Sequence, residues 1–494
     1  MSELYLGIDL GTGSCKTSLI NQDGQILGLG SGKYISPTHS SDWKEQEPAS
    51  IIQGMIAAVQ QVIGKTNQPK LNIKAISIGA AQHGIMAVDK DGNPLTNVFT
   101  WADDRAASQA QRLKDSKWSV DLYQQTGCPP HGMYPLYKII WLRENQPEIF
   151  KKTAKFISVK EYILQKLCGE YIVDYTIASA TGLLNTHFLR WDQLTLELAQ
   201  IETEKLSKLA GPRQTLSITN QSMADELGIS ANTPVILGSS DAVNSTLGAG
   251  ALEASQATCM IGTSGAFRIL SPQPLLHPNA SSWCYCLDEE HWLVGGAINN
   301  GGLALSWLRD ILQKISENDI SFDDLLTYAQ GSTIGADGVF CLPFFAGERS
   351  PNWNLDARAA FFGLSIEHDI RHISRAILEG IAFRLRSLDE VLKEMKVDIH
   401  EIRASGGFTQ SDFWVQLVAD VLGQPISVPA EGETSCLGAA FWAFWGIDPS
   451  TAFSDIKNWV KISKTYQPQS DAHSKYNHFF STYKKLYQAV SPFF

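Results

Sequence analysis

The segment Leu6-Gly-Ile-Asp-Leu-Gly-Thr-Gly-Ser-Cys-Lys-Thr-Ser-Leu-Ile20 consists of two apolar stretches joined by a Gly-Thr turn, and Thr258-Cys-Met-Ile-Gly-Thr-Ser-Gly-Ala-Phe-Arg-Ile-Leu270 repeats this design about half a chain later. Glycine allows the close backbone approach and positive φ that tight turns use. The backbone N–H groups of such a turn can bind phosphate, and a threonine hydroxyl adds a donor beside them. Two copies predict two related domains that close on one phosphate chain, although two ordinary hairpins would show the same pattern.

The first segment also resembles a P-loop between Gly11 and Thr17. That pattern requires a glycine before its Lys-Ser/Thr pair, and a helix follows it. Here Cys15 precedes Lys16 and a strand is expected to follow. We therefore exclude a P-loop.

The composition is that of an ordinary globular protein. The chain has 494 residues, 44% of them hydrophobic and 18% charged, which is too long for one core and predicts two large domains. A net charge of −11 argues against nucleic-acid and membrane partners. The apolar stretch 437–447 is too short to span a bilayer.

The N-terminus and the cysteines indicate a cytoplasmic protein. Met1-Ser-Glu-Leu4 runs directly into a strand, so no signal peptide is expected. The eight cysteines are scattered, and only Cys284 and Cys286 are close together. We interpret these two as residues on alternate faces of a strand rather than as a metal site or disulfide. A reduced, cytoplasmic enzyme fits this pattern best.

Strands and helices alternate in both halves of the chain. Strands are predicted at 4–10, 16–21, 26–30, 73–79, 98–101, 234–238, 339–342 and 402–405, and helices at 47–63, 135–144, 158–167, 302–314 and 370–393. This alternation favours α/β domains built on mixed sheets. We place the two domains at 1–247 and 248–494, with a cleft between them.

Three charged residues are candidates for phosphate chemistry. Asp9 follows a buried strand and could hold a hydrated magnesium ion or cap the turn through its own side chain. Lys16 could reach a phosphate or remain a solvated lysine. Asp241 ends an apolar strand, where it could accept a proton as a general base or cap the following helix.

Polar groups also gather after two other predicted strands. His83 stands in Gln82-His-Gly84, and Trp101 is followed by Asp103, Asp104 and Arg105. Planar and bidentate groups of this kind suit a polyol pocket, and loop residues often carry function. A structural role for His83 is the alternative.

Two further segments identify a family resemblance. Met133-Tyr-Pro-Leu-Tyr-Lys-Ile-Ile-Trp-Leu142, together with Ala359-Ala-Phe-Phe-Gly-Leu364 and His372-Ile-Ser-Arg-Ala-Ile-Leu-Glu379, resembles the two signature patterns of the FGGY carbohydrate kinases. The resemblance covers the chain from about residue 3 to about residue 450. It implies two ribonuclease-H-like domains of the actin-like ATPase type with a central cleft, and ATP and Mg²⁺ as cofactors.

The resemblance also assigns roles by position. Asp241 matches the catalytic base and Asp9 the metal-binding carboxylate. The cofactor-binding positions are Gly11, Thr12, Gly13, Ser14, Lys16, Gly262, Thr263, Gly302, Gly406, Gly407, Gln410 and Ser411. The substrate-binding positions are Gln82, His83, Gly84, Trp101, Asp103, Arg105 and Met133.

Within the family, the segments 100–105, 158–163, 173–183 and 299–305 resemble the gluconate kinases most. This implies phosphorylation of the terminal hydroxyl of D-gluconate to 6-phosphogluconate, with Arg105 and His131 as candidates for binding its carboxylate. Gln82-His83-Gly84 departs from that branch toward the xylulose kinases, so a xylulose kinase or another polyol kinase is the alternative. A non-catalytic sugar-binding regulator is a third alternative, but it would not need a base such as Asp241. The resemblance also favours a homodimer.

Overall fold

The structure, a computed structural model, describes residues 3–35, 43–65, 71–316, 319–448 and 450–494. Met1 and Ser2, on which the expectation about a signal peptide partly rests, lie outside these ranges. Among the described residues, no helix combines the length and apolar composition needed to cross a membrane.

The first half of the chain builds a six-stranded sheet of order β13-β14-β5-β1-β2-β3. Its strands are β1 (Leu4–Leu10), β2 (Ser14–Asn21), β3 (Ile26–Lys33), β5 (Ile73–Ala80), β13 (Thr215–Leu216) and β14 (Val235–Ile236). β1, β2 and β3 form consecutive antiparallel hairpins, whereas β5 runs parallel to both β1 and β14. The predicted turn at Gly24 adopts φ 75°, which a glycine tolerates without strain.

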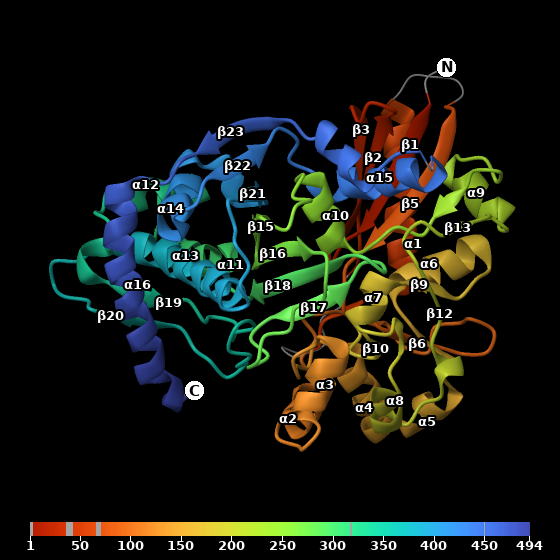
Figure 1. Ribbon diagram of the computed structural model, residues 1–494, viewed down its shortest axis with the longest axis horizontal. Helices are drawn as coiled ribbons and strands as arrows, with labels where there is room; N and C mark the ends of the chain where they lie inside the picture. The colour runs from red at the N-terminus through yellow and green to blue at the C-terminus, as the bar shows by residue number, and fades with distance from the viewer. Residues whose placement is uncertain (1–2, 36–42, 66–70, 317–318, 449) are drawn as a thin grey trace.

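The second half builds a seven-stranded sheet of order β17-β18-β16-β15-β21-β22-β23. Its strands are β15 (Gln256–Ile261), β16 (Gly265–Ser271), β17 (Trp283–Cys286), β18 (Trp292–Ile298), β21 (Glu401–Ser405), β22 (Ile426–Pro429) and β23 (Ile462–Tyr466). Leaving out the edge strand β17, the order and the strand directions match those of the first sheet, with β15 and β16 in the places of β1 and β2. The duplication predicted from the two Gly-Thr segments is therefore confirmed, and Figure 1 shows the two sheets in red and in green to blue.

Helices cover the sheets, and α2 to α8 lie in the segment between β5 and β13 (residues 81–214), which is called the inserted segment below. The helices of the first half are α1 (Pro48–Lys65), α2 (Ala107–Lys114), α3 (Ser119–Thr126), α4 (Pro135–Asn145), α5 (Pro147–Lys152), α6 (Val159–Cys168), α7 (Tyr175–Ser179), α8 (Gln193–Ala199), α9 (Gln221–Leu227) and α10 (Asp241–Gly248). Those of the second half are α11 (Gly302–Ile315), α12 (Phe322–Gln330), α13 (Ile370–Glu394), α14 (Asp412–Leu422), α15 (Thr434–Ile447) and α16 (Ser470–Val490).

Short strand pairs complete the fold. They are β4 (Glu45–Gln46) with β7 (Val98–Phe99), β6 (Met86–Val88) with β8 (Lys155–Ile157), β9 (Ile172–Asp174) with β12 (Lys208–Ala210), β10 (Leu184–Asn185) with β11 (Arg190–Trp191), and β19 (Phe340–Leu342) with β20 (Ala360–Phe362). All predicted elements are present, but β7 and β14 are shorter than expected because the chain turns at Thr100 and at Gly238.

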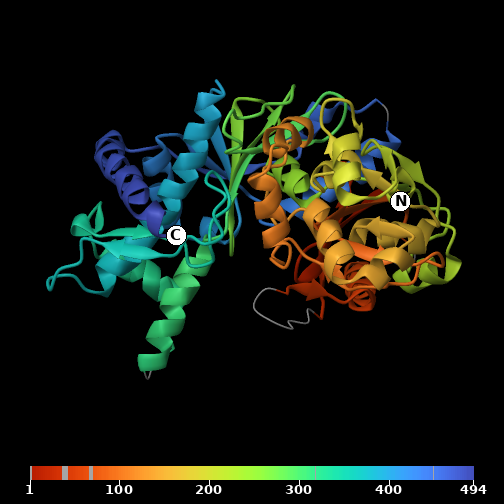
Figure 2. The same cartoon turned by 90° about the horizontal axis from the view of Figure 1, so that it is seen from below.

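The inserted segment lies beside the edge of the second sheet, as Figure 2 shows for its orange helices next to the green strands. The backbone N–H of Cys284 in β17 donates to the carbonyl of Gly127, which ends α3 (2.9 Å). Cys284 and Cys286 are both buried in one core cluster, whereas Trp283 and Tyr285 belong to another. The expectation that the two cysteines occupy alternate faces is wrong, because residues two apart on a strand share a face.

Helix α15 crosses from the second half to cover the first sheet. It packs against β1 and β5, on the face opposite α1, and against α10. The approach is close: a Cβ on Gly7 of β1 would collide with the Ala440 backbone, and one on Gly438 would collide with the carbonyl of Asn244 in α10. Residues 437–445 therefore lie largely in the core.

Gly438→Ala should destabilise the protein because its methyl group has no space between α15 and α10. Overpacking of this kind costs about 1–3 kcal/mol, and we expect a drop in Tm of roughly 5 °C, measured by thermal unfolding. Gly64→Ala is the matched control, since a Cβ at Gly64 in α1 meets no atom within 4 Å. That variant should gain up to about 1 kcal/mol from helix propensity. Equal Tm values for the two variants would contradict the close-packing argument.

Candidate active site

The first Gly-Thr turn connects β1 to β2. The N–H of Gly11 donates to the carbonyl of Ser14 (3.1 Å), and the side chain of the buried Gln46 donates to the carbonyl of Thr12. Thr12 and Gly13 are exposed at the tip. A strand follows the turn, in agreement with the exclusion of a P-loop.

The second turn connects β15 to β16 in the same way. The N–H of Gly262 donates to the carbonyl of Ser264 (2.9 Å), and Thr263 is exposed. The start of α11 rests on this turn, because Gly302 donates to the Gly262 carbonyl (2.7 Å) and Leu303 to the Thr263 carbonyl (3.0 Å). The two turns thus present matched exposed threonines, and the second also carries a helix N-terminus, which favours anions.

A cavity of about 310 Å³ opens beside the second turn. It gathers six of the positions predicted to face a nucleotide, namely Gly262, Thr263, Gly302, Gly407, Gln410 and Ser411. Its apolar walls include Phe322, Leu326 and Trp414, which the sequence analysis did not identify. Gly406 lies behind the wall at φ 94°, where a Cβ would approach the Ile261 carbonyl to 2.5 Å. The arrangement offers a slot with apolar walls that ends at the backbone predicted to bind phosphate.

Asp9 and Lys16 meet the start of α15. The Oδ2 of Asp9 accepts a hydrogen bond from Ser435 (2.7 Å), and Lys16 forms an ion pair with Glu433 (2.7 Å) that is partly exposed. Ser435 and Glu433 were not identified as site residues, since only the tertiary packing of α15 brings them to the first turn. The polar stretch Glu431-Gly-Glu-Thr-Ser435, just before an apolar helix, is the signal that could have indicated them.

The surroundings of Asp9 fit a hydrated magnesium ion. Its Oδ1 is buried without a partner, and burial raises the pKa of this carboxyl against the opposing effects of Ser435 and Lys16. A cation would supply the missing partner. Among the described residues, no group of three His, Cys, Asp or Glu side chains could hold a metal by itself. The donor set therefore suits an ion held through water and phosphate, the usual mode of Mg²⁺.

Asp241 is the first residue of α10 and is partly exposed. Its Oδ1 accepts from the N–H of Ala242 (2.7 Å). Burial raises its pKa to about 7, the Asp9 carboxylate adds to the shift, and Arg268 of β16 opposes it. Arg268 is buried and donates to Ser245 on the next turn of α10 (2.6 Å). Asp241 is thus a carboxylate poised near neutral pH, as a general base requires.

A buried polar network lies behind Asp241. Lys160 and Asp174 form a fully buried ion pair (2.6 Å), and Asp174 accepts from the Thr176 hydroxyl. That hydroxyl also contacts Ser239 (2.9 Å) and accepts from the N–H of Ser240 (2.9 Å). Because Ser239 and Ser240 directly precede Asp241, the network fixes the backbone that aims this carboxylate. The segments 158–163 and 173–183 supply these residues.

His83 adopts φ 65° and is buried. Its Nδ1 donates to the Ala180 carbonyl (2.8 Å), and burial lowers the pKa of the ring to about 3. The ring is therefore neutral with Nε2 free to accept. The buried Lys138 donates to the carbonyls of His83 (3.3 Å) and Thr100 (2.5 Å), so it ties together the two loops predicted to hold the sugar.

Trp101 connects the predicted sugar loops to the first turn, because its indole N–H donates to the Thr12 hydroxyl (3.0 Å). Gln82 is also near the centre, since its N–H supports the Asp241 carboxylate and its side chain donates to the Thr176 carbonyl (3.4 Å). Gly84 is partly exposed, whereas Met133 is buried.

Asp103 and Arg105 have a different setting from the expected one. Arg105 bonds Asp103 (2.7 Å) and Glu45 (2.5 Å), and its side chain is 1% exposed. Its guanidinium also packs on the rings of Phe99 and Trp43. The structure does not bring Arg105 to the cleft, because its charge is already compensated inside the inserted segment.

A second cavity of about 650 Å³ lies between the two halves. The first half contributes Trp101 and His131, and the second contributes Thr263. It also contains Arg349, whose guanidinium carbon lies 4.8 Å from the centre of the Trp101 ring. Arg349 was not identified from the sequence, although the adjacent charges of Glu348 and Arg349 in the loop after β19 were a signal for it.

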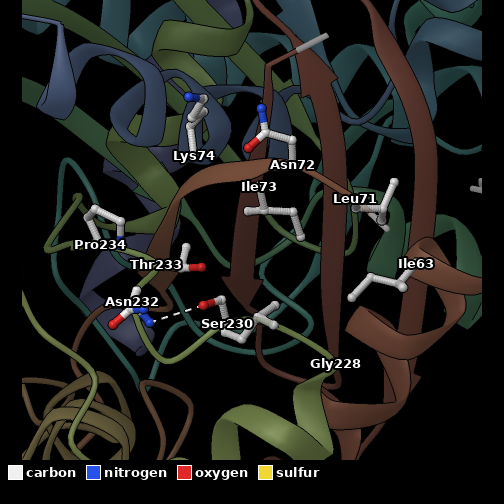
Figure 3. A pocket seen from close by; sticks show the side chains of 11 residues that line it. Ile63, Leu71, Asn72, Ile73, Lys74, Gly228, Ser230, Asn232, Thr233 and Pro234 are labelled. Atoms are coloured by element: carbon white, nitrogen blue, oxygen red, sulfur yellow. Dashed lines mark hydrogen bonds between the residues drawn. The ribbon is translucent and has the colours of Figure 1, made fainter. Parts of the chain in front are cut away.

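A third cavity, of about 530 Å³, lies at the opposite end of β5 and is shown in Figure 3. Ile73, Asn232 and Pro234 are among the residues that line it. Its polar groups bond locally, as Asn232 N–H does to the Ser230 hydroxyl (3.2 Å). None of the predicted site residues lies there, so we assign it no role.

Comparison with known proteins covers nearly the whole chain. Residues 4–248 match the N-terminal domain of the FGGY family of carbohydrate kinases, and residues 257–447 match its C-terminal domain. A gluconokinase from Bacillus subtilis is 35% identical over 486 residues, which cover 96% of this chain and 94% of the relative.

Two solved structures from Lactobacillus acidophilus, a gluconate kinase and a ligand-bound xylulose kinase, superpose equally well. Each has a TM-score of 0.93 and 33% identity and covers 99% of this chain and 98% of its own. These values agree with the expected fold of two ribonuclease-H-like, actin-like domains.

Gly406 and Gly407 should respond differently to alanine substitution. Gly406→Ala forces a side chain into positive φ and toward the Ile261 carbonyl, so we expect a lower Tm. A Cβ on Gly407 meets no protein atom within 4 Å but enters the cavity wall. Gly407→Ala should keep the wild-type Tm within about 1 °C and weaken ADP binding about tenfold, as measured by calorimetry. If Gly407→Ala bound ADP with wild-type affinity, the nucleotide would not bind in this cavity.

Proposed function

The chain belongs to the FGGY family of carbohydrate kinases, and on that premise we propose that it transfers a phosphoryl group from ATP to the terminal hydroxyl of D-gluconate, giving 6-phosphogluconate. The observation that carries this proposal is the setting of Asp241. Its carboxylate is poised near pH 7 beside the unpartnered oxygen of Asp9, where a hydroxyl can be deprotonated next to a phosphate chain.

In this proposal Asp241 orients the acceptor hydroxyl and takes its proton as the new O–P bond forms and ADP leaves. A positioned base of this kind contributes about 100- to 10,000-fold in rate. Thr12 and Thr263, with the backbone N–H groups of their turns, bind the equatorial oxygens of the transferring group. Positioning and electrostatics of this type dominate phosphoryl transfer.

Asp9, assisted by the hydroxyl of Ser435, would hold Mg²⁺ through water. The ion would neutralise charge on the β- and γ-phosphates. Lys16 lies at the mouth of the same site and would exchange Glu433 for a phosphate, since its ion pair is partly exposed and therefore weak. The apolar slot lined by Trp414 would receive the adenosine.

D-Gluconate is preferred over D-xylulose as the acceptor because of the 35% identity to a gluconokinase and the segments 100–105 and 299–305. Xylulose kinase activity is the second candidate. It is favoured by Gln82-His83-Gly84 and by the equally good superposition on a xylulose kinase. We also propose that the two domains divide at 247/248. A cytoplasmic location is proposed as well, and the eight free, buried cysteines support it.

The test is ATP turnover with magnesium against gluconate, xylulose, ribulose, glycerol and other polyols. Selective turnover of gluconate to 6-phosphogluconate is the expected result. A preference for a ketopentose would overturn the gluconate assignment and leave the kinase chemistry in place. The Asp241→Asn protein, purified in parallel, controls for contaminating kinases.

Asp241→Asn should lower kcat by at least about 1,000-fold, because an amide cannot accept the proton. The Kd for ADP should stay within about threefold of wild type, since the nucleotide cavity does not include this residue. Asp225→Asn, the same change on an exposed surface of α9, should leave both values unchanged. Turnover near the wild-type rate in Asp241→Asn would refute its role as the base.

The pH dependence of kcat/KM should show an acid limb with a midpoint near pH 7. Asp241, with its pKa raised to about 7, is ionised above this value and becomes protonated as the pH falls, so kcat/KM should drop about tenfold per unit below pH 6. His83 and His131, with pKa values near 3, do not titrate in this range.

Lys138 needs a separate control because burial lowers its pKa to about 7 as well. Lys138 loses its charge as the pH rises, so it affects the alkaline limb of the kcat/KM profile. Lys138→Met should change the alkaline limb and leave the acid limb as in wild type. A profile that is flat from pH 5.5 to 8 in wild type would contradict the assignment of Asp241.

A further inference from the structure

We propose that Arg349 and His131 form the subsite that binds the carboxylate of a sugar-acid substrate. This inference rests on the proposed function and names the groups that would distinguish a sugar acid from a neutral sugar. Arg349 takes the place of the earlier candidate Arg105, whose guanidinium is paired with Asp103 and Glu45.

Arg349 is a buried cation without a carboxylate partner. It is 8% exposed, and among the described residues it forms no ion pair within 4 Å. One guanidinium N–H bonds the Ile298 carbonyl (3.1 Å), while Nε is buried with no partner. The adjacent Glu348 accepts from the backbone N–H of Arg349 (2.9 Å) and its charge favours the guanidinium, but its carboxylate forms its ion pair with Arg384 (3.0 Å). A buried charged donor that is left unpaired costs stability. Arg349 is therefore suited to bind an anionic group that arrives with a ligand.

His131 supplies a second unused donor. Its Nδ1 accepts from the N–H of Met133 (3.2 Å), and burial, together with the Arg349 charge, lowers the pKa of the ring to about 3. A neutral ring whose Nδ1 accepts must carry its proton on Nε2. That Nε2–H is buried and has no partner. Both unsatisfied donors therefore belong to side chains at least nine-tenths buried.

Both residues line the cavity of about 650 Å³ between the two halves. The remaining charged residues of its wall are Lys44, Asp104 and Arg358. Arg358 is exposed, and its guanidinium donates to the carbonyls of Leu355 and Ala357 in its own loop. The same cavity includes Thr263 of the second phosphate turn and Trp101, which lies under Arg349 and bonds Thr12 of the first turn. A sugar acid lying along Trp101 would place its carboxylate at Arg349 and His131 and its far hydroxyl toward the phosphate turns.

The experiment compares D-gluconate with D-gluconamide, which has the same hydroxyls but a neutral end. For wild type we expect kcat/KM for gluconate to exceed that for gluconamide about 100-fold, the usual effect of a buried, hydrogen-bonded charge pair. In Arg349→Gln this ratio should fall to within about threefold of unity, while the KM for ATP stays unchanged. If Arg349 had a merely structural role, kcat/KM would fall equally for both substrates and their ratio would be preserved.

Arg358→Gln is the matched control, because it removes the same charge from an exposed residue of the same cavity. Its ratio should remain within about threefold of wild type. A ratio that collapses in Arg358→Gln, or one that persists in Arg349→Gln, would overturn the proposal.

His131 provides an independent pair of variants should Arg349→Gln fold poorly. His131→Leu removes the Nε2 donor and should lower the ratio about tenfold, whereas His131→Gln places an amide N–H near the same position and should restore it. Equal ratios in the two variants would count against the subsite. A wild-type enzyme that prefers neutral substrates would overturn the proposed function and the subsite together, whereas a wild type that prefers gluconate with an unchanged ratio in Arg349→Gln would overturn the subsite alone.

Discussion

The contact of α15 with β1 and α10 is the constraint on which the rest of the structure depends. Glycines at positions 7 and 438 let backbone pack on backbone, so a helix from the second half closes one face of the first sheet. The first turn of that helix carries Ser435 to Asp9, and Glu433 just before it meets Lys16. The candidate phosphate site is therefore complete only when α15 has docked on the first sheet.

The electrostatics at the centre follow from this docking. Asp9 and Asp241 come from the ends of two strand-loop segments of the first half; Asp9 is buried and Asp241 is partly exposed. Their mutual repulsion and their burial raise the pKa of Asp241 to about 7, and Arg268, which reaches across from the second sheet, limits the shift. A single domain would hold the two carboxylates without this compensating cation. The two halves thus set the protonation state of the central carboxylate jointly.

Much of the fold could be predicted from local sequence. The apolar run of β1, the glycine turn at Gly24 and the long amphipathic pattern of α13 are local signals, and the corresponding elements are present. β7 and β14 were overextended because Thr100 and Leu237, residues that also suit a strand, directly follow the last paired positions. The face shared by Cys284 and Cys286 follows from strand geometry alone, and there the interpretation, not the sequence, was at fault.

By itself, the sequence determined the duplicated Gly-Thr hairpins, the alternation of strands and helices in both halves and the family to which the chain belongs, because all of these are read from residues adjacent in the chain. Only the tertiary structure decided which charges remain available to a ligand. Arg105 and Arg349 look equivalent as letters, yet one is paired with two carboxylates and the other keeps an unpartnered donor in the central cavity. The reason is physical: burial and pairing depend on side chains hundreds of residues apart, and these determine the charge and the free hydrogen-bonding capacity of every group in the site.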